Sequence, residues 1–136
     1  MNLVKMRAIG DCGPACLAMI TGAELDDVIA WARARERTYA YGTAALNDDD
    51  LLDYLHEHGY PDARQVTSSP EPPAILIVPS LNVPGLLHYV VWADERTILD
   101  PSLGPKLWPD DAPEVNGERA GVQWATAIEP RERRAA

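Results

Sequence analysis

Cysteine is scarce in this sequence: the 136 residues contain only Cys12 and Cys16. Small disulfide-stabilised proteins are far richer in cysteine, so a disulfide scaffold is excluded. A chain of about this length buries roughly 70% of its unfolded surface, which makes a core possible without disulfides or metals. Hydrophobic residues make up 46% of the chain and charged residues 24%. These ordinary values indicate a single globular domain and exclude a disordered chain.

Positive charge is also in short supply, with 12 Lys and Arg against 21 Asp and Glu, a net charge of −9. Such a chain lacks the basic surface that binds nucleic acid or anionic lipid, so neither is an expected partner. The one basic cluster, at residues 131–134, is interpreted as a solvated tail. The sequence contains no apolar run long enough to span a bilayer, and its N-terminus lacks a hydrophobic signal segment. We therefore expect a cytoplasmic protein. The oligomeric state is not indicated.

The chain divides into a helical first part and a strand-rich second part, which predicts an α+β fold. Apolar patterns predict three helices, near residues 11–22, 24–35 and 47–59. Alternating and β-branched residues predict strands over residues 74–78, 87–93, 97–100 and 122–128. We therefore describe residues 1–136 as one domain with a helical part of about 1–66, a proline-rich loop of about 67–73, a sheet part of about 74–128 and a tail over 129–136.

The helix ends carry recognisable signals. Asp11 is a predicted N-cap for the first helix, and Gly22 suits the position just after its end. Asn47 is a predicted N-cap for the third helix, and the three carboxylates at residues 48–50 complement its dipole. Consecutive residues do not face one another on a helix, so this acidic run is interpreted as capping and not as a metal site.

Cys12 is the residue with the strongest indication of chemistry. It stands where a loop becomes a helix, in a segment that reads Gly-Asp-Cys-Gly-Pro over residues 10–14. A helix N-terminus favours the thiolate, and cysteines there can have pKa values of roughly 3.5 to 7.5. Gly13 is expected to let a substrate approach the backbone closely. The alternative is that Cys12, like most free cysteines, is a small buried core residue.

A general base for Cys12 is expected at His88, in an otherwise apolar and aromatic strand. A hairpin loop over residues 93–95 would place His88 directly opposite Asp100, with Cβ atoms about 5 Å apart. Asp100 would then hold one imidazole nitrogen while the other accepts a proton from Cys12, the arrangement of a Cys-His-Asp triad. The alternative is that His88, as a lone histidine in an apolar strand, has only a structural role.

The remaining cysteine and histidines are assigned no catalytic role. Cys16 is interpreted as a core residue, and an i, i+4 disulfide with Cys12 is geometrically poor. His56 and His58 are expected to complement the dipole at the end of the third helix. Their spacing is too short for a typical zinc site, so we predict neither a metal nor a cofactor.

Three segments together resemble the papain-like cysteine peptidases, most closely the C39 and C39-like group: Asp-Cys-Gly-Pro-Ala-Cys-Leu at 11–17, His-Tyr-Val-Val-Trp at 88–92 and Leu-Asp-Pro at 99–101. The resemblance extends over residues 6–101. It implies a nucleophile at Cys12, a general base and acid at His88 and an orienting carboxylate at Asp100. It also implies a helical subdomain packed against an antiparallel sheet, with the cleft between them.

One position departs from the family pattern. A glutamine that donates to the oxyanion usually stands six residues before the nucleophile, and here that position is Met6. A thioether cannot donate a hydrogen bond, and losing one oxyanion donor costs about 100- to 1000-fold in a well-studied protease. Arg7, Lys5 or Asn2 are candidate substitutes. We place Met6, Arg7, Asp11 and Gly13 at the predicted oxyanion site and cleft.

Three functions follow from these residues. The first is a cysteine peptidase or related thiol acyl-transfer enzyme that acts on a peptide or protein substrate through a thioester. The second, favoured by Met6, is a catalytically weak or inactive papain-like domain that binds a peptide or a partner protein. The third is a small structural protein in which Cys12 is only part of the core.

Overall fold

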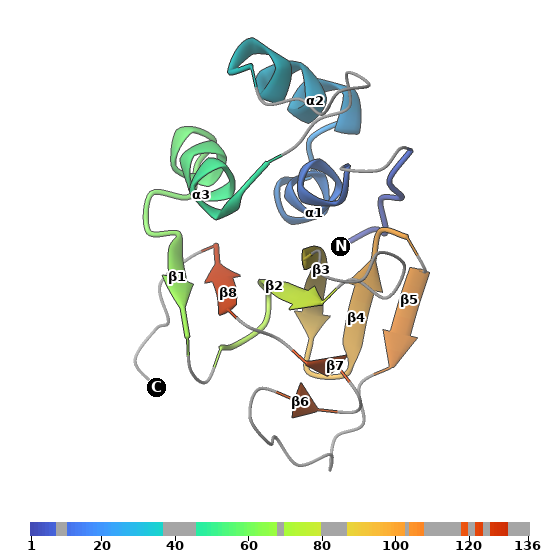
Figure 1. Ribbon diagram of the computed structural model, residues 1–136. Coiled ribbons are helices and arrows are strands. Elements are labelled where there is room, and N and C mark those ends of the chain that lie inside the picture. Colours follow the sequence, from blue (N-terminus) through green and yellow to red (C-terminus); the bar gives the residue numbers. More distant parts are fainter. Residues whose placement is uncertain are drawn as a thin grey trace.

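The computed structural model describes residues 1–7, 11–36, 46–67, 70–79, 87–102, 104–107, 118–119, 122–123 and 126–130. The predicted basic cluster and most of the predicted tail lie outside these ranges. The described residues form three helices and two sheets (Figure 1). In this part of the chain, no helix is long and apolar enough to cross a membrane.

All three predicted helices are present, within a few residues of the predicted ends: α1 over Cys12–Thr21, α2 over Leu25–Ala34 and α3 over Asp48–Glu57. Gly22 ends α1 with a left-handed backbone at φ +76°, and its N–H donates to Ala18. A side chain is rarely accommodated at such a φ, which explains the glycine. Asn47 caps α3 as predicted, because its side chain accepts from the N–H of Asp50.

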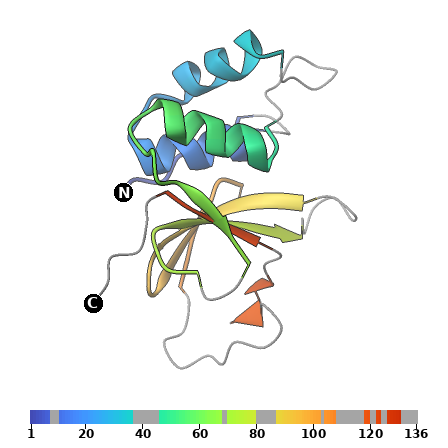
Figure 2. The ribbon, with the colours of Figure 1, turned by 90° about the vertical axis from the view of Figure 1, so that its left-hand side faces the viewer.

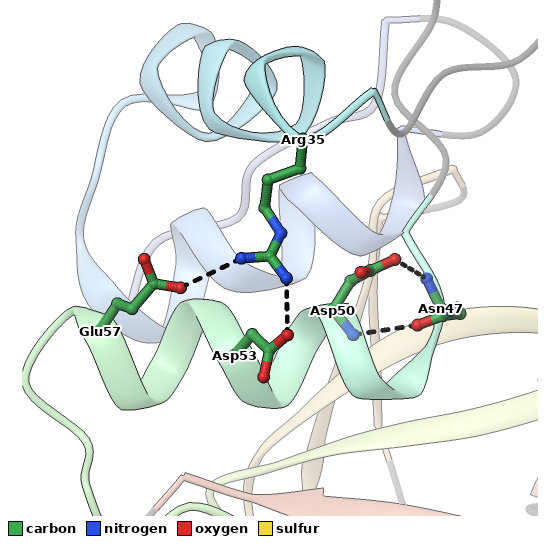
Figure 3. A network of polar contacts seen from close by, with 5 residues as sticks. All are labelled: Arg35, Asn47, Asp50, Asp53 and Glu57. Carbon is green, nitrogen blue, oxygen red and sulfur yellow. Dashed lines mark hydrogen bonds and ion pairs between the residues drawn. The ribbon is translucent and has the colours of Figure 1, made fainter.

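α2 and α3 are joined by charged side chains at their surface (Figure 3). Arg35, just after α2, donates to Asp53 at 2.7 Å and to Glu57 at 3.5 Å. The same guanidinium lies over the ring of Trp31, 4.6 Å from its centroid. These contacts are solvent-exposed, so we expect each to contribute little to the free energy of unfolding.

The main sheet has six antiparallel strands in the order β1-β8-β2-β3-β4-β5. Its strands are β1 (Arg64–Val66), β2 (Ala74–Pro79), β3 (Leu87–Asp94), β4 (Thr97–Asp100), β5 (Gly104–Leu107) and β8 (Thr126–Glu129). The short strands β6 (Glu118–Arg119) and β7 (Val122–Gln123) pair only with each other. The predicted strand over residues 122–128 is therefore divided between two sheets.

β1 lies within the part of the chain that was predicted to be helical. It has only three residues, two of them exposed, so it carries no hydrophobic alternation from which a strand could be predicted. Its pairing with β8, which brings Gln65 opposite Ile128, defines it as a strand. A long-range contact, and not local sequence preference, forms this strand.

The three helices lie together on one side of the sheet (Figures 1 and 2). Alternate residues of the strands supply the core between the two layers, among them Ile75, Ile77, Tyr89, Val91 and Leu99. The intervening residues, such as Leu76, Val90, Trp92 and Ile98, form a second buried cluster. α1 is buried on nearly its whole circumference, as predicted from its apolar sequence, and it packs against β3. The N-terminus of this central helix is thereby held against the strand that carries His88.

Candidate active site

Cys12 is the first residue of α1 and is partly exposed, with its remaining surface packed against the core. Cys16, one turn further along, is completely buried, and both thiols are free. Burial raises the pKa of the Cys16 thiol well above its ordinary value, with smaller contributions from Cys12 and Asp100. The structure therefore separates an accessible thiol at the helix end from an inert one in the core.

The hairpin of β3 and β4 differs from the predicted register. Val91 pairs with Leu99 and Trp92 with Ile98, and a bulge follows before Asp94 pairs with Thr97. When this register is continued along the two strands, His88 lies two residues away from the position opposite Asp100. The predicted direct pairing was wrong because the turn is tighter than the three-residue loop and the bulge takes up the extra residue. A shift of two residues leaves both side chains on the same face, and diagonal neighbours remain within reach of long side chains.

His88 and Asp100 are indeed in contact. The imidazole Nε2 lies 2.9 Å from Oδ1 of Asp100, and because a carboxylate can only accept, Nε2 is the nitrogen that carries the proton. Both side chains are largely buried, with 15% of His88 and 8% of Asp100 exposed. Since Nε2 is occupied by Asp100, Nδ1 is the ring nitrogen left for Cys12.

The electrostatics of the three side chains are coupled. Burial lowers the pKa of His88, but hydrogen bonds to Asp100 and Cys12, together with their charges, outweigh burial and raise that pKa to about 9. Burial raises the pKa of Asp100, and its bonds to His88 and Ser102 overcome this and hold it well below the ordinary range. The imidazolium and the carboxylate are therefore both charged near neutral pH.

Ser102, which was not among the predicted site residues, also binds the carboxylate. Its backbone N–H donates to Oδ1 of Asp100 at 2.9 Å and its hydroxyl to the same oxygen at 2.8 Å. The backbone contact is a turn in which a carboxylate accepts from the N–H two residues later, a common role of Asp. The Asp-Pro-Ser order at residues 100–102 was therefore a sequence signal for it.

Asp11 and Gly13 flank Cys12 in the sequence. Asp11 occupies the N-cap position, but its backbone angles of φ −80° and ψ 3° are outside the extended region and its side chain makes no capping hydrogen bond. The predicted side-chain cap was therefore wrong. A Cβ on Gly13 would lie 3.3 Å from Cβ of Leu46 and 3.4 Å from Leu51. The glycine thus lets α1 pack closely, and its role toward a substrate stays a prediction.

The remaining residues assigned to the oxyanion site lie in the N-terminal segment. The N–H of Met6 donates to the carbonyl oxygen of Pro101 at 3.0 Å, which ties this segment to the turn after Asp100. The guanidinium of Arg7 forms an ion pair with Asp26 of α2, at 2.5 Å and in an exposed position. Arg7 is thus occupied at the surface in this structure, and its role as a substitute donor stays a prediction.

The other two histidines lie at the end of α3 and bind backbone oxygens. His56 donates from Nε2 to Ala63, and His58 donates from Nδ1 to Tyr54. Among the described residues, no three His, Cys, Asp or Glu side chains form a group that could hold a metal ion. The candidate site itself presents a thiol, an imidazole and a carboxylate, from Cys12, His88 and Asp100.

No protein-family model matches this chain, and no curated protein matches it by sequence. Among solved structures, the chain is similar to a double glycine motif protease from an AMS/PCAT transporter, solved in complex with the leader peptide. The match has a TM-score of 0.60 and 18% identity, and covers 93% of this chain and 88% of that one. The similarity supports a papain-like, C39-like fold. It agrees with the predicted α+β architecture of helices packed on an antiparallel sheet.

Proposed function

We propose that this protein is a cysteine peptidase or closely related thiol hydrolase, with Cys12 as nucleophile, His88 as general base and acid, and Asp100 as the orienting carboxylate. The observation that carries the proposal is the imidazole of His88, which interacts with Cys12 and donates to Asp100 at 2.9 Å. A nucleophile, a base and an orienting group in this order are what thiol acyl transfer needs.

In the acylation step, the proton of the Cys12 thiol resides on His88 and the thiolate sulfur attacks the carbonyl carbon of the substrate. A C–S bond forms and the carbonyl π electrons move to oxygen, which becomes an oxyanion. The tetrahedral intermediate then collapses, the C–N bond breaks, and the imidazolium gives its proton to the leaving amine. The product is a thioester on Cys12 and a free amine. Asp100 keeps the ring oriented and stabilises its charge throughout.

In the deacylation step, neutral His88 takes a proton from water while the water oxygen attacks the thioester carbonyl. The C–S bond breaks, the acid product leaves, and the pair of Cys12 thiolate and His88 imidazolium is restored. The same sequence with an amine in place of water gives transpeptidation, and with a glutamine side chain as substrate it gives deamidation. The three reactions share the acylation step, so they require the same three residues.

Stabilisation of the oxyanion is the weak part of this mechanism. The backbone N–H of Cys12 is a natural donor, because it lies at the N-terminus of α1. The side chain of Met6 supplies no donor, and its backbone N–H is engaged with Pro101. We therefore expect slower turnover than in enzymes with two donors.

A peptide is the proposed substrate class. The similar protease was solved with a leader peptide, which supports a peptide-binding site in this fold. The test is to incubate the protein with a mixture of peptides, including sequences with and without paired glycines, and to identify products by mass spectrometry. We expect the parent and Cys16→Ala to cleave and Cys12→Ala to be inactive. Cleavage by Cys12→Ala at the parent's rate would contradict the proposal.

The second candidate function is a domain that binds a peptide or partner protein with little or no catalysis. Met6 favours it, because the thioether removes one expected donor while the fold is retained. This function predicts that peptides bind without being cleaved, and that Cys12→Ala binds as tightly as the parent. Titration of the same peptides against both proteins distinguishes the two functions.

A further inference from the structure

We infer that Ser102 is a positioning residue, whose hydroxyl fixes the Asp100 carboxylate so that Oδ1 points at Nε2 of His88. The inference rests on the proposed function, because the positioning matters for the His88–Cys12 pair. In the contacts described above, Ser102 binds Asp100 and neither Cys12 nor the imidazole, so it would act through Asp100.

Three donors meet at one oxygen of Asp100. Oδ1 of Asp100 accepts from His88 at 2.9 Å, from the Ser102 N–H at 2.9 Å and from the Ser102 hydroxyl at 2.8 Å. A carboxylate held by one donor can rotate and present either oxygen. With two further donors on the same oxygen, rotation would break three hydrogen bonds, so the orientation is fixed.

The turn that carries Ser102 is itself held in place. Pro101 restricts the backbone between the two residues, and its carbonyl oxygen accepts from the N–H of Met6 at 3.0 Å. Pro101 and Asp100 are buried, and Ser102 is partly buried. The hydroxyl is therefore presented from a rigid support, as a positioning group requires.

Buried Asp100 must stay ionised to stabilise a protonated His88, and burial by itself opposes that charge. The two donations from Ser102 favour the charged carboxylate, because they act on the oxygen that carries the charge. Ser102 thus supports both the ionisation and the orientation of the carboxylate.

The test measures the pKa of His88 by NMR of its imidazole in the parent, Ser102→Ala and Ser102→Thr. We expect Ser102→Ala to lower this pKa by about half a unit to one unit, a three- to tenfold weaker proton affinity, because a less ordered carboxylate stabilises the imidazolium less. Ser102→Thr keeps the hydroxyl and should restore the parent value. A pKa unchanged or raised in Ser102→Ala would overturn the inference, since a hydroxyl that only withdraws charge from Asp100 would have the opposite effect.

Thr97→Ala is the matched control, because it also removes a hydroxyl that binds an aspartate, Asp94, at the far end of the same hairpin. It should leave the pKa of His88 unchanged. If Ser102→Ala does not fold, Ser102→Cys replaces it, since a thiol is a weak donor of similar size.

A second measurement separates failure of this inference from failure of the proposed function. Alkylation of Cys12 by iodoacetamide is followed against pH in the parent, in His88→Ala and in Ser102→Ala. If His88→Ala leaves the profile unchanged, the proposed thiol–imidazole pair is wrong. If His88→Ala changes the profile but Ser102→Ala alters neither the profile nor the pKa of His88, only the positioning role is wrong.

Discussion

α1 and α3 are both α-helices, but the capping of their N-termini differs. At α3, Asn47 and Asp50 cap each other's backbone N–H groups at 2.9 and 3.0 Å (Figure 3). Asp48, Asp49 and Asp50 all lie in the first turn of this helix. At α1, the side chain of Asp11 makes no capping bond and no acidic residue lies in the first turn. The positive end of α3 is therefore neutralised by its own side chains, whereas the N-cap side chain of α1 makes no such contact.

The two helices also differ in how deeply they are buried. α3 has a polar, exposed side, and its cap stabilises a surface helix. α1 is surrounded by the core, which holds it in place without a capping side chain. The comparison shows that packing can hold a helix in place where no side-chain cap stabilises its N-terminus.

The largest expected effect comes from removing the imidazole beside α1. We expect His88→Ala to slow alkylation of Cys12 at pH 6 on the order of 100-fold, because the thiolate then loses its ion-pair partner. Site-resolved mass spectrometry after iodoacetamide treatment measures this rate. His56→Ala is the control from α3 and should leave the rate unchanged, because its imidazole binds Ala63. Equal alkylation rates in the parent and His88→Ala would contradict the prediction that the imidazole beside α1 activates Cys12.

The next effect is on stability as a function of pH. The pKa of His88 is about 9 in the folded protein and about 6.5 in an unfolded chain, so the folded state binds the proton more tightly. The stabilisation is complete below about pH 6.5 and is lost as the pH rises through 9. We expect the free energy of unfolding to fall over this interval by roughly 2 to 3 kcal/mol. Urea unfolding at a series of pH values measures it, and the fall should be much smaller in His88→Ala.

A donor added near α1 should increase turnover. Met6→Gln introduces a side-chain amide in the segment held to Pro101, and we expect a gain in kcat of about tenfold or more if the amide reaches the oxyanion. Peptide cleavage measured under saturating substrate tests this. Met6→Leu, which has similar volume and no donor, should match the parent. An equal gain from leucine would mean that packing and not hydrogen bonding limits the rate.

The smallest expected effect comes from removing the cap of α3. Asn47→Ala should lower the free energy of unfolding by about 1 kcal/mol, because the capping box is lost. Asp49→Ala removes a first-turn charge from the same helix and should cost less, about 0.3 to 0.5 kcal/mol. Urea unfolding gives both values. Alkylation of Cys12 should be unchanged in both variants, and a slower rate in Asn47→Ala would show that the two helix ends are coupled.

Much of the fold could be predicted because its signals are local. Gly22, Asn47 and the apolar sequence of α1 specify the helices through backbone conformation, capping and burial, which depend on neighbouring residues. The strand over residues 97–100 was predicted with its observed bounds. β1 could not be predicted, since it is defined by pairing with β8, and the separation of β7 from β8 also depends on which strands they meet.

The candidate site shows the same division. The residue types and their order, Cys12, His88 and Asp100, were selected from the sequence, and the structure brings the three together. The hairpin register was predicted incorrectly by two residues, because the bulge before Asp94 depends on how two strands fit and not on one sequence segment. The error left both side chains on one face, so the predicted contact survived it.

The sequence by itself determined the three helices, the order of helices before strands and the three residues proposed for chemistry, because these follow from the preferences of neighbouring residues. The tertiary structure alone decided that Asp11 does not cap α1, that Met6 binds Pro101 and that Ser102 and His88 share one oxygen of Asp100. These contacts depend on distances of about 3 Å between groups whose relative positions are set by packing of the whole domain.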